Sequence, residues 1–344
     1  MGIRRQGTRM MIATTAHSAQ LCIDALNTVR HSGSSPLDTI MTMANTLEFS
    51  GQAWVIRAQS RSRRPDGWPA WFARNTREKP LLCLHRAVSS AQLSALSDQT
   101  MQRGILCNDI ENQPSPWPKG TQPSLPLWLA SNPRCTPYDP ASGDEARAIM
   151  LAALRTLYVE DKPGFYYLAL HHHESTVPLN TQDREDALNG MYPIRCDHLG
   201  QVRLLGAGRV LEEVVQAAQL LKQDWNVTAQ VWSCPSYTRL AREAEAAERW
   251  NRLHPLAPRR SCHLRDCLAG NMAPVIAITG YPQPIADQLA AYVDAQFVAL
   301  GAGSVQPSAP NRYWIAVLSL KALADEGHID AQQVENALHR YHLT

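Results

Sequence analysis

The sequence predicts an α/β fold in which a mostly parallel, twisted sheet carries helices on both faces. From residue 201 onward, short apolar segments typical of strands alternate with stretches whose apolar residues recur at helical spacing. Each strand and its helix take about 25 to 40 residues, the usual size of a βα unit. With 344 residues, of which 44% are hydrophobic, the chain is long enough for two domains with separate cores.

The predicted elements begin with a helix over 145–159, for which Ser142 or Asp144 can act as the N-cap. Pro163 and Gly164 end that unit, and the aromatic and aliphatic run at 165–170 is typical of a buried strand. A closing helix is stopped by Gly327. The further predicted elements are a strand at 202–208 that ends in a glycine turn, a helix over 210–221, a strand at 228–234, helix 238–250, strand 273–280, helix 285–293, strand 296–301 and the closing helix 314–326.

The first 137 residues are less regular. Segments 60–69 and 112–126 concentrate Pro, Gly and Ser, which neither a helix nor a central strand tolerates well. The periodic stretches between them are short: a helix over 16–29 and an apolar run at 81–84. We therefore expect this region to fold only loosely.

Composition narrows the class of protein. With 33 basic against 31 acidic side chains the formal net charge is +2, which does not favour nucleic acid or an anionic membrane as partner. No apolar run is long enough to span a bilayer, and the mean hydropathy is -0.29. We expect a cytoplasmic protein. An organellar transit peptide is the alternative, because Arg4, Arg5 and Arg9 precede the first acid, Asp24.

The eight cysteines form no CxxC pair, which favours reduced, buried thiols over a disulfide framework. Cys262, His263 and Cys267 lack the paired spacing of a zinc site, so no metal site is expected.

One segment is more specific. The string ERWNRLHP at 248–255, preceded by conserved-type strands and helices at 202–227 and 231–243, is similar to the C-terminal domain of the homodimeric pyruvate dehydrogenase first component. That family is transketolase-like and depends on thiamine diphosphate. The segments 137–154 and 164–170 resemble the end of its pyrimidine-binding domain, and 321–330 resembles its last helix.

The resemblance extends from 137 to 335 and implies two domains. Residues 1–195 would form a reduced pyrimidine-binding-like domain, and residues 196–344 a doubly wound, transketolase C-terminal-like domain. Enzymes of this family hold the cofactor between a pyrimidine-binding domain and a diphosphate-binding domain of another subunit. The Gly-Asp-Gly signature of the latter has its nearest match at Asp66-Gly67, which follows Pro65 and is interpreted as a turn.

The family also uses a glutamate against the aminopyrimidine ring. Glu48 and Glu78 are the formal candidates, but neither lies in the family's sequence context, and a solvated surface acid is the favoured alternative. No cofactor-binding residue is assigned.

The segment HHHESTVP at 171–178 stands where the family has an Asn-Glu-Asn type stretch followed by His and Pro. Pro178 and Glu174 match, whereas the family's histidine falls on Ser175 or Thr176. The resemblance therefore gives His173 and Glu174 as candidate catalytic residues, with a shifted histidine among His171, His172 and His173. The alternative is a polar loop with solvated imidazoles or an adventitious metal site.

Two further segments bear on the site. Gly206-Ala207-Gly208 follows a strand, but Leu211 stands where a dinucleotide fingerprint needs its third glycine, so a tight turn is favoured over a phosphate site. The loop at 300–314 is shorter than the Gly, Asp and Arg rich loop of the family and lacks its acids.

These departures favour a non-autonomous, catalytically degenerate paralogue of the pyruvate dehydrogenase first component, which acts as a homodimer or with a diphosphate-domain partner. The chain alone would then bind no cofactor, and thiamine diphosphate and magnesium would bind only if the partner supplied that domain. The first alternative is the β-like subunit of a split thiamine-diphosphate enzyme that transfers an acyl group from a 2-oxoacid. A sensing or structural module that kept only the fold is the second.

Overall fold

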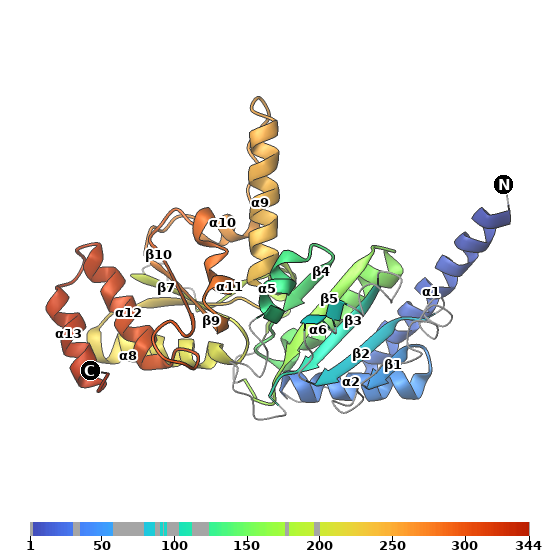
Figure 1. The fold of residues 1–344 in the computed structure, drawn as a ribbon, viewed down its shortest axis with the longest axis horizontal. Helices are drawn as coiled ribbons and strands as arrows, with labels where there is room; N and C mark the ends of the chain where they lie inside the picture. The colour runs from blue at the N-terminus through green and yellow to red at the C-terminus, as the bar shows by residue number, and fades with distance from the viewer. Residues whose placement is uncertain are drawn as a thin grey trace. The chain divides into compact units, whose positions relative to one another are not determined.

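The computed structural model describes residues 3–29, 35–57, 79–86, 90–91, 93–94, 103–111, 124–175, 179–195 and 200–343. The chain divides into two compact units, Met1–Pro178 and Leu179–Thr344. Each unit contains a five-stranded sheet with helices packed against it, which confirms the α/β fold (Figure 1).

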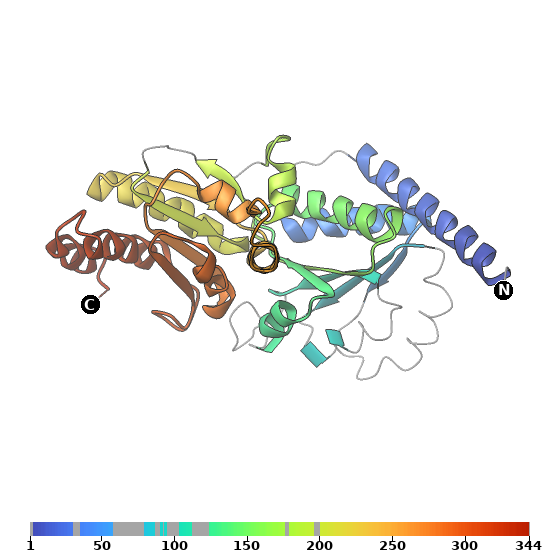
Figure 2. The same ribbon diagram turned by 90° about the horizontal axis from the view of Figure 1, so that it is seen from above.

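The first unit contains a parallel sheet in the order β1-β2-β3-β5-β4. Helices α1, α2 and α6 cover one of its faces (Figure 2). The strands are β1 (Trp54–Arg57), β2 (Leu81–Arg86), β3 (Arg103–Asp109), β4 (Cys135–Tyr138) and β5 (Gly164–Leu170); the helices are α1 (Ile3–Thr28), α2 (Pro36–Ser50), α5 (Ser124–Ser131) and α6 (Gly143–Leu154), which continues into a π-helical turn, η2 (Arg155–Val159).

Two helices of this unit begin at well-formed N-caps. The Ser35 hydroxyl accepts a hydrogen bond from the Asp38 amide, and Pro36 supplies a preset backbone angle at the first position of α2. At α6 the Ser142 hydroxyl accepts from the Glu145 amide, as the sequence predicted. Glu145 in turn accepts from the Ala141 amide at 2.6 Å, which completes a capping box.

The expectation that residues 1–137 fold only loosely is wrong for their described part. β1, β2 and β3 belong to the sheet, and Leu82, Ile105 and Leu106 are at most 1% exposed. Parallel strands are covered on both faces and so lack the polar alternation that reveals a strand in the sequence. The helix expected over 16–29 begins at Ile3, and α2 and β3 were not predicted.

The second unit contains a sheet in the order β10-β9-β7-β8-β6, in which only the β6–β8 pairing is antiparallel. Its strands are β6 (Tyr192–Arg195), β7 (Val202–Gly206), β8 (Ala229–Ser233), β9 (Val275–Pro282) and β10 (Phe297–Ala302). Its helices are α7 (Arg184–Asn189), α8 (Leu211–Trp225), α9 (Tyr237–Leu253), α10 (His263–Leu268), α11 (Pro284–Asp287), α12 (Arg312–Asp325) and α13 (Ala331–Arg340), with 3-10 turns η3 (Gly208–Val210) and η4 (Ala290–Tyr292).

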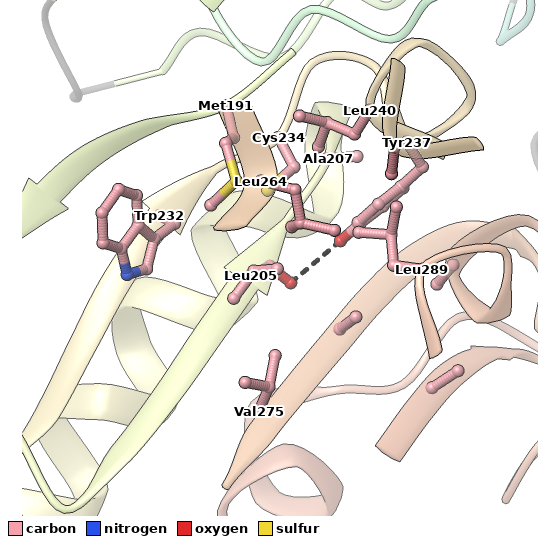
Figure 3. Close-up of a cluster of buried hydrophobic side chains, with 14 of the residues drawn as sticks. Met191, Leu205, Ala207, Trp232, Cys234, Tyr237, Leu240, Leu264, Val275 and Leu289 are labelled. Carbon is pink, nitrogen blue, oxygen red and sulfur yellow. Dashed lines mark hydrogen bonds between the residues drawn. The ribbon is translucent and has the colours of Figure 1, made fainter. Parts of the chain in front are cut away.

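Both faces of this second sheet are covered. A cluster of buried side chains joins β7, β8 and β9 to α9, α10 and α11 on one face (Figure 3). On the other face α8 packs over Gly206 and contacts α12, and the Arg312 guanidinium forms two hydrogen bonds to the Glu213 carboxylate at 2.7 and 2.9 Å. The sheet is therefore doubly wound, as predicted.

The predicted strands of this unit are all present. The helix expected over 285–293 is wrong: α11 ends at Asp287, and a separate 3-10 turn follows. Ala286 and Leu289 are fully buried in these two turns, so the apolar spacing is satisfied without a continuous helix. After α12 the chain forms α13, whose N-cap Asp330 accepts from the Gln332 amide. Strand β6 lies in the second unit, whereas the sequence placed the boundary after residue 195.

Candidate functional site

The carboxyl ends of the parallel strands of the first unit meet at one edge of its sheet, the position where α/β proteins bind ligands. Buried polar side chains are concentrated there. His85 ends β2, Asn108 and Asp109 end β3, Asp139 follows β4 and His171 follows β5. None of these five residues is more than 8% exposed. We call these five residues the carboxyl-edge cluster.

The strand register fixes which of these side chains share a face. β2 and β3 pair with His85 opposite Asn108 and with Arg86 opposite Asp109. Because residues paired in a parallel ladder project to the same side, His85 and Asn108 lie on one face and Arg86 and Asp109 on the other. The Asn108 amide donates to the Tyr167 hydroxyl at 2.9 Å, and the Arg86 guanidinium lies 4.0 Å from the Asp109 carboxylate.

His85 is held as a neutral imidazole. Burial lowers its pKa from 6.5 to about 4, because the protein interior disfavours the charged ring. Its Nε2 atom is buried and has no hydrogen-bond partner among the residues that the structure describes. Such a group can donate to or accept from a further molecule at this edge.

His171 makes a structural connection. Its side chain is fully buried, and Nε2 lies 3.1 Å from the Pro140 carbonyl oxygen. A carbonyl only accepts, so Nε2 carries the proton. The His171 backbone oxygen accepts from the Leu37 amide at 3.2 Å, which ties the end of β5 to the start of α2. The alternative of solvated imidazoles is therefore wrong for His171.

The two candidate catalytic residues lie further along the same segment. His173 and Glu174 are exposed, as is His172, and they lie in irregular chain after β5. The structure does not bring His173 or Glu174 into the buried part of the carboxyl edge. Ser175 is half-buried, while Thr176 and Pro178 lie outside the described residues.

The glutamates proposed for the aminopyrimidine ring fare differently. Glu48 lies in the last turns of α2, where its side chain is 57% exposed and forms an ion pair with Arg57 at 3.1 Å. Glu78 and Asp66-Gly67 lie outside the described residues. The sequence analysis missed Glu145, which is fully buried at the start of α6 and caps that helix. Its position three residues after Ser142 was the signal that could have identified it.

In the part of the chain that the structure describes, no group of three or more His, Cys, Asp or Glu side chains could hold a metal ion. Among the described helices, none combines the length and apolar character needed to cross a bilayer.

Packing explains the glycine turn of the second unit. A Cβ atom on Gly206 would lie 3.0 Å from side-chain atoms of Leu211 and Val214, and Gly208 has a φ of +57°. The carboxyl ends of β7 and β9 are closed by Tyr237, whose hydroxyl lies 3.1 Å from the Leu205 oxygen and 3.0 Å from the Ile278 oxygen (Figure 3). Tyr237 therefore fills this edge with a structural contact.

Comparison with known proteins identifies the class. Residues 190–312 match the model of the transketolase-like TK C-terminal domain. A transketolase mutant from Pichia stipitis has a TM-score of 0.59 at 12% identity, covering 90% of this chain and 50% of that chain. A split gene transketolase, described as an inactive beta4 tetramer, has a TM-score of 0.57 at 12% identity, covering 85% of this chain and 99% of that chain. The chain has a transketolase-like fold, and its C-terminal region is a transketolase C-terminal-like domain.

The curated relatives define the branch. The pyruvate dehydrogenase E1 component of Cupriavidus necator is 36% identical over 234 residues, which are 63% of this chain and 26% of that protein. The corresponding protein of Pseudomonas aeruginosa is 34% identical over 230 residues, 62% of this chain and 26% of that protein. The chain thus spans about a quarter of the length of these relatives. The relationship inferred from the ERWNRLHP segment is confirmed for this region.

Proposed function

We propose that this chain is a non-autonomous, catalytically degenerate relative of the pyruvate dehydrogenase first component, which acts in the cytoplasm as a dimer or with a partner subunit. One observation carries the proposal: the polar groups of the carboxyl edge serve the fold. Asn108 binds Tyr167, His171 binds the Pro140 carbonyl and Glu145 caps α6. A classical active site would instead direct such groups at substrate or cofactor.

The fit to thiamine diphosphate supports the same proposal. In the resembled enzymes a glutamate must reach the aminopyrimidine ring from a fixed position. Glu48 is exposed and paired with Arg57, and Glu145 is occupied by the Ala141 amide. Neither residue fits that role, so no catalytic step through the cofactor is derived for this chain.

Dependence on a partner is supported by the split gene transketolase. This chain matches 99% of the length of that protein, which is described as inactive in its beta4 form. A chain with these two units can therefore exist as a separate subunit. The near balance of 33 basic and 31 acidic side chains favours protein partners over nucleic acid or membrane.

The alternative is a working β-like subunit of a split thiamine-diphosphate enzyme that acts on a 2-oxoacid. The buried, neutral His85 favours it, because its Nε2 has no partner among the described residues. In this alternative the exposed His173 and Glu174 would be catalytic once a partner subunit covered the loop after β5. A neighbouring gene that encodes intact Gly-Asp-Gly and Asn signatures would favour this subunit.

Light scattering and a pyruvate decarboxylation assay on the purified chain test the proposal. We expect an oligomer with no turnover, and no turnover after addition of any co-purifying subunit. Decarboxylation by the chain alone, or a monomer at micromolar concentration, would contradict it. Turnover that appears only with a partner, and that falls about 100-fold or more in His173→Ala or Glu174→Ala, would establish the alternative.

A further inference from the structure

The far end of α9 carries a feature that the proposed function leaves unused. In the second unit, α9 extends well beyond the sheet that its first turns cover (Figure 1). The segment 249–260, which we call the α9 tip, consists of the last turn of the helix and the loop that follows. Leu253 in this tip is 67% exposed and Leu256 is fully exposed.

The α9 tip is ordered by its own contacts. Asn251 and Arg260 exchange two hydrogen bonds: the Asn251 amide donates to the Arg260 oxygen at 3.0 Å, and the Arg260 amide donates to the Asn251 side-chain oxygen at 2.7 Å. His254 stacks on Trp250 with ring centres 4.5 Å apart, and its Nδ1 lies 2.8 Å from the Trp250 oxygen. The two exposed leucines are thus presented on a preorganised loop.

The charge of the α9 tip is one-sided. It contains four arginines and no acidic residue, although the whole chain is nearly balanced. Arg249, Arg252, Arg259 and Arg260 are all exposed. The Arg260 guanidinium lies 4.0 Å above the Trp250 ring, which holds its planar donors in a fixed orientation.

The nearest acid does not neutralise this charge. Glu248, just before the tip, binds Arg265. The pKa of the Glu248 carboxyl is lowered first by that hydrogen bond and further by the charges of Arg265, Arg259 and Arg252. The tip therefore presents a positive potential around an apolar centre.

We propose that the α9 tip is a docking site for a protein partner whose surface presents carboxylates around an apolar pocket. Leu253 and Leu256 would fill the pocket, and the arginines would bind the carboxylates around it. An apolar centre with a polar rim is the usual anatomy of a protein interface, and Trp and Arg are enriched at such sites. Planar guanidinium groups match carboxylates with two parallel hydrogen bonds.

Charge and shape argue against two other occupants. A second copy docked tip to tip would place arginines against arginines, which is repulsive. A membrane surface is bound by a helix with a broad apolar face, whereas two leucines on a stacked loop offer little apolar area.

The inference rests on the proposed function in one respect, the need for a partner, and it names the chemistry of that partner. The two can fail separately. A partner that binds elsewhere on the chain would remove the docking site and leave the proposed function intact. Turnover by the chain alone would remove the proposed function and leave a test of the tip unaffected.

The experiment places a benzophenone amino acid at position 256 of the full chain and irradiates it in soluble extract of the native host. We expect a crosslink to one protein, mapped to a segment rich in Asp and Glu with apolar residues between them. The Arg252→Glu/Arg259→Glu variant should lower the crosslink yield about tenfold. Arg184→Glu, an exposed arginine on α7 of the same unit, should leave it unchanged.

A second measurement covers the other occupants. The labelled chain is mixed with vesicles of phosphatidylserine and phosphatidylcholine, and its sedimentation with them should not exceed that of the Arg252→Glu/Arg259→Glu variant. A crosslink to lipid, to nucleic acid or to a second copy of the chain would overturn the proposal. A crosslink to a basic segment, or no crosslink at all, would do the same.

Discussion

At the scale of single residues, neighbouring histidines of the loop after β5 have different environments. His171 is fully buried with Nε2 at 3.1 Å from the Pro140 oxygen, whereas His172 and His173 are exposed. We expect His171→Ala to lower the free energy of unfolding by about 1 to 3 kcal/mol, because it leaves a buried carbonyl without its donor. The His172→Ala/His173→Ala variant should change it by less than about 0.5 kcal/mol. Urea unfolding measures both, and equal effects would contradict the distinction.

His85 links stability to pH. Its folded pKa of about 4 lies below its ordinary value of 6.5, so between these values the unfolded chain binds a proton that the folded chain does not. Its contribution is therefore intact above about pH 6.5 and is lost as the pH falls toward 4. Between about pH 7 and about pH 5 the loss is about 2 kcal/mol, at 1.36 kcal/mol per pKa unit.

His85→Leu tests this linkage, since leucine fills similar space and cannot bind a proton. The fall in unfolding free energy between the two pH values should be about 2 kcal/mol smaller in the variant than in the original chain. Denaturant unfolding at both values gives the comparison. Parallel pH profiles of the two proteins would show that His85 is not held neutral.

At the scale of elements, Tyr237 joins two strands of the second sheet. Its hydroxyl lies within hydrogen-bond distance of the Leu205 and Ile278 oxygens, at the carboxyl ends of β7 and β9. Tyr237→Phe should cost about 1 to 3 kcal/mol of unfolding free energy, because two buried carbonyls lose their donor. Tyr313→Phe is the matched control, since that side chain is 40% exposed, and it should cost less than about 0.5 kcal/mol. A cost for Tyr237→Phe no greater than that of the control would show that the hydroxyl does not join the strands.

The sequence predicted elements well where local signals agreed. β5, β7, β8, β9 and β10 were found because apolar runs of strand length end at glycine, proline or polar residues. It failed for β3 and α2, whose identity depends on burial against elements distant in the sequence. A helix was predicted at 285–293 because two short turns can bury the same apolar residues as a helix.

The candidate site was less predictable than the fold. Glu145 and His171 lie in segments that the sequence analysis marked, but their burial and partners arise only when β4, β5 and α6 come together. His85 ends a run that the sequence showed only as LLCL, and nothing local indicates that its ring is enclosed. Register between strands decides which polar residues meet, and register is a tertiary property.

At the scale of the whole molecule, the two units of this chain correspond to the pyrimidine-binding and C-terminal parts of the resembled enzymes. In those enzymes most of the charge of thiamine diphosphate lies on the diphosphate, which a magnesium ion and the diphosphate-binding domain neutralise. This chain would offer the aminopyrimidine ring only the carboxyl edge of its first sheet, where Glu145 is occupied by the Ala141 amide.

We therefore expect the purified 344-residue chain to bind thiamine diphosphate with a Kd in the millimolar range, about -4 kcal/mol, as befits a contact of fragment size. Calorimetric titration with the cofactor and magnesium at micromolar protein should give no heat beyond dilution. The E1 component of Escherichia coli, a relative 31% identical over 226 residues, provides the parallel titration. Heat that fits a micromolar Kd for this chain would mean that its own residues suffice to hold the cofactor. The degenerate function would then be untenable, since a chain that binds the cofactor alone needs no partner for that step.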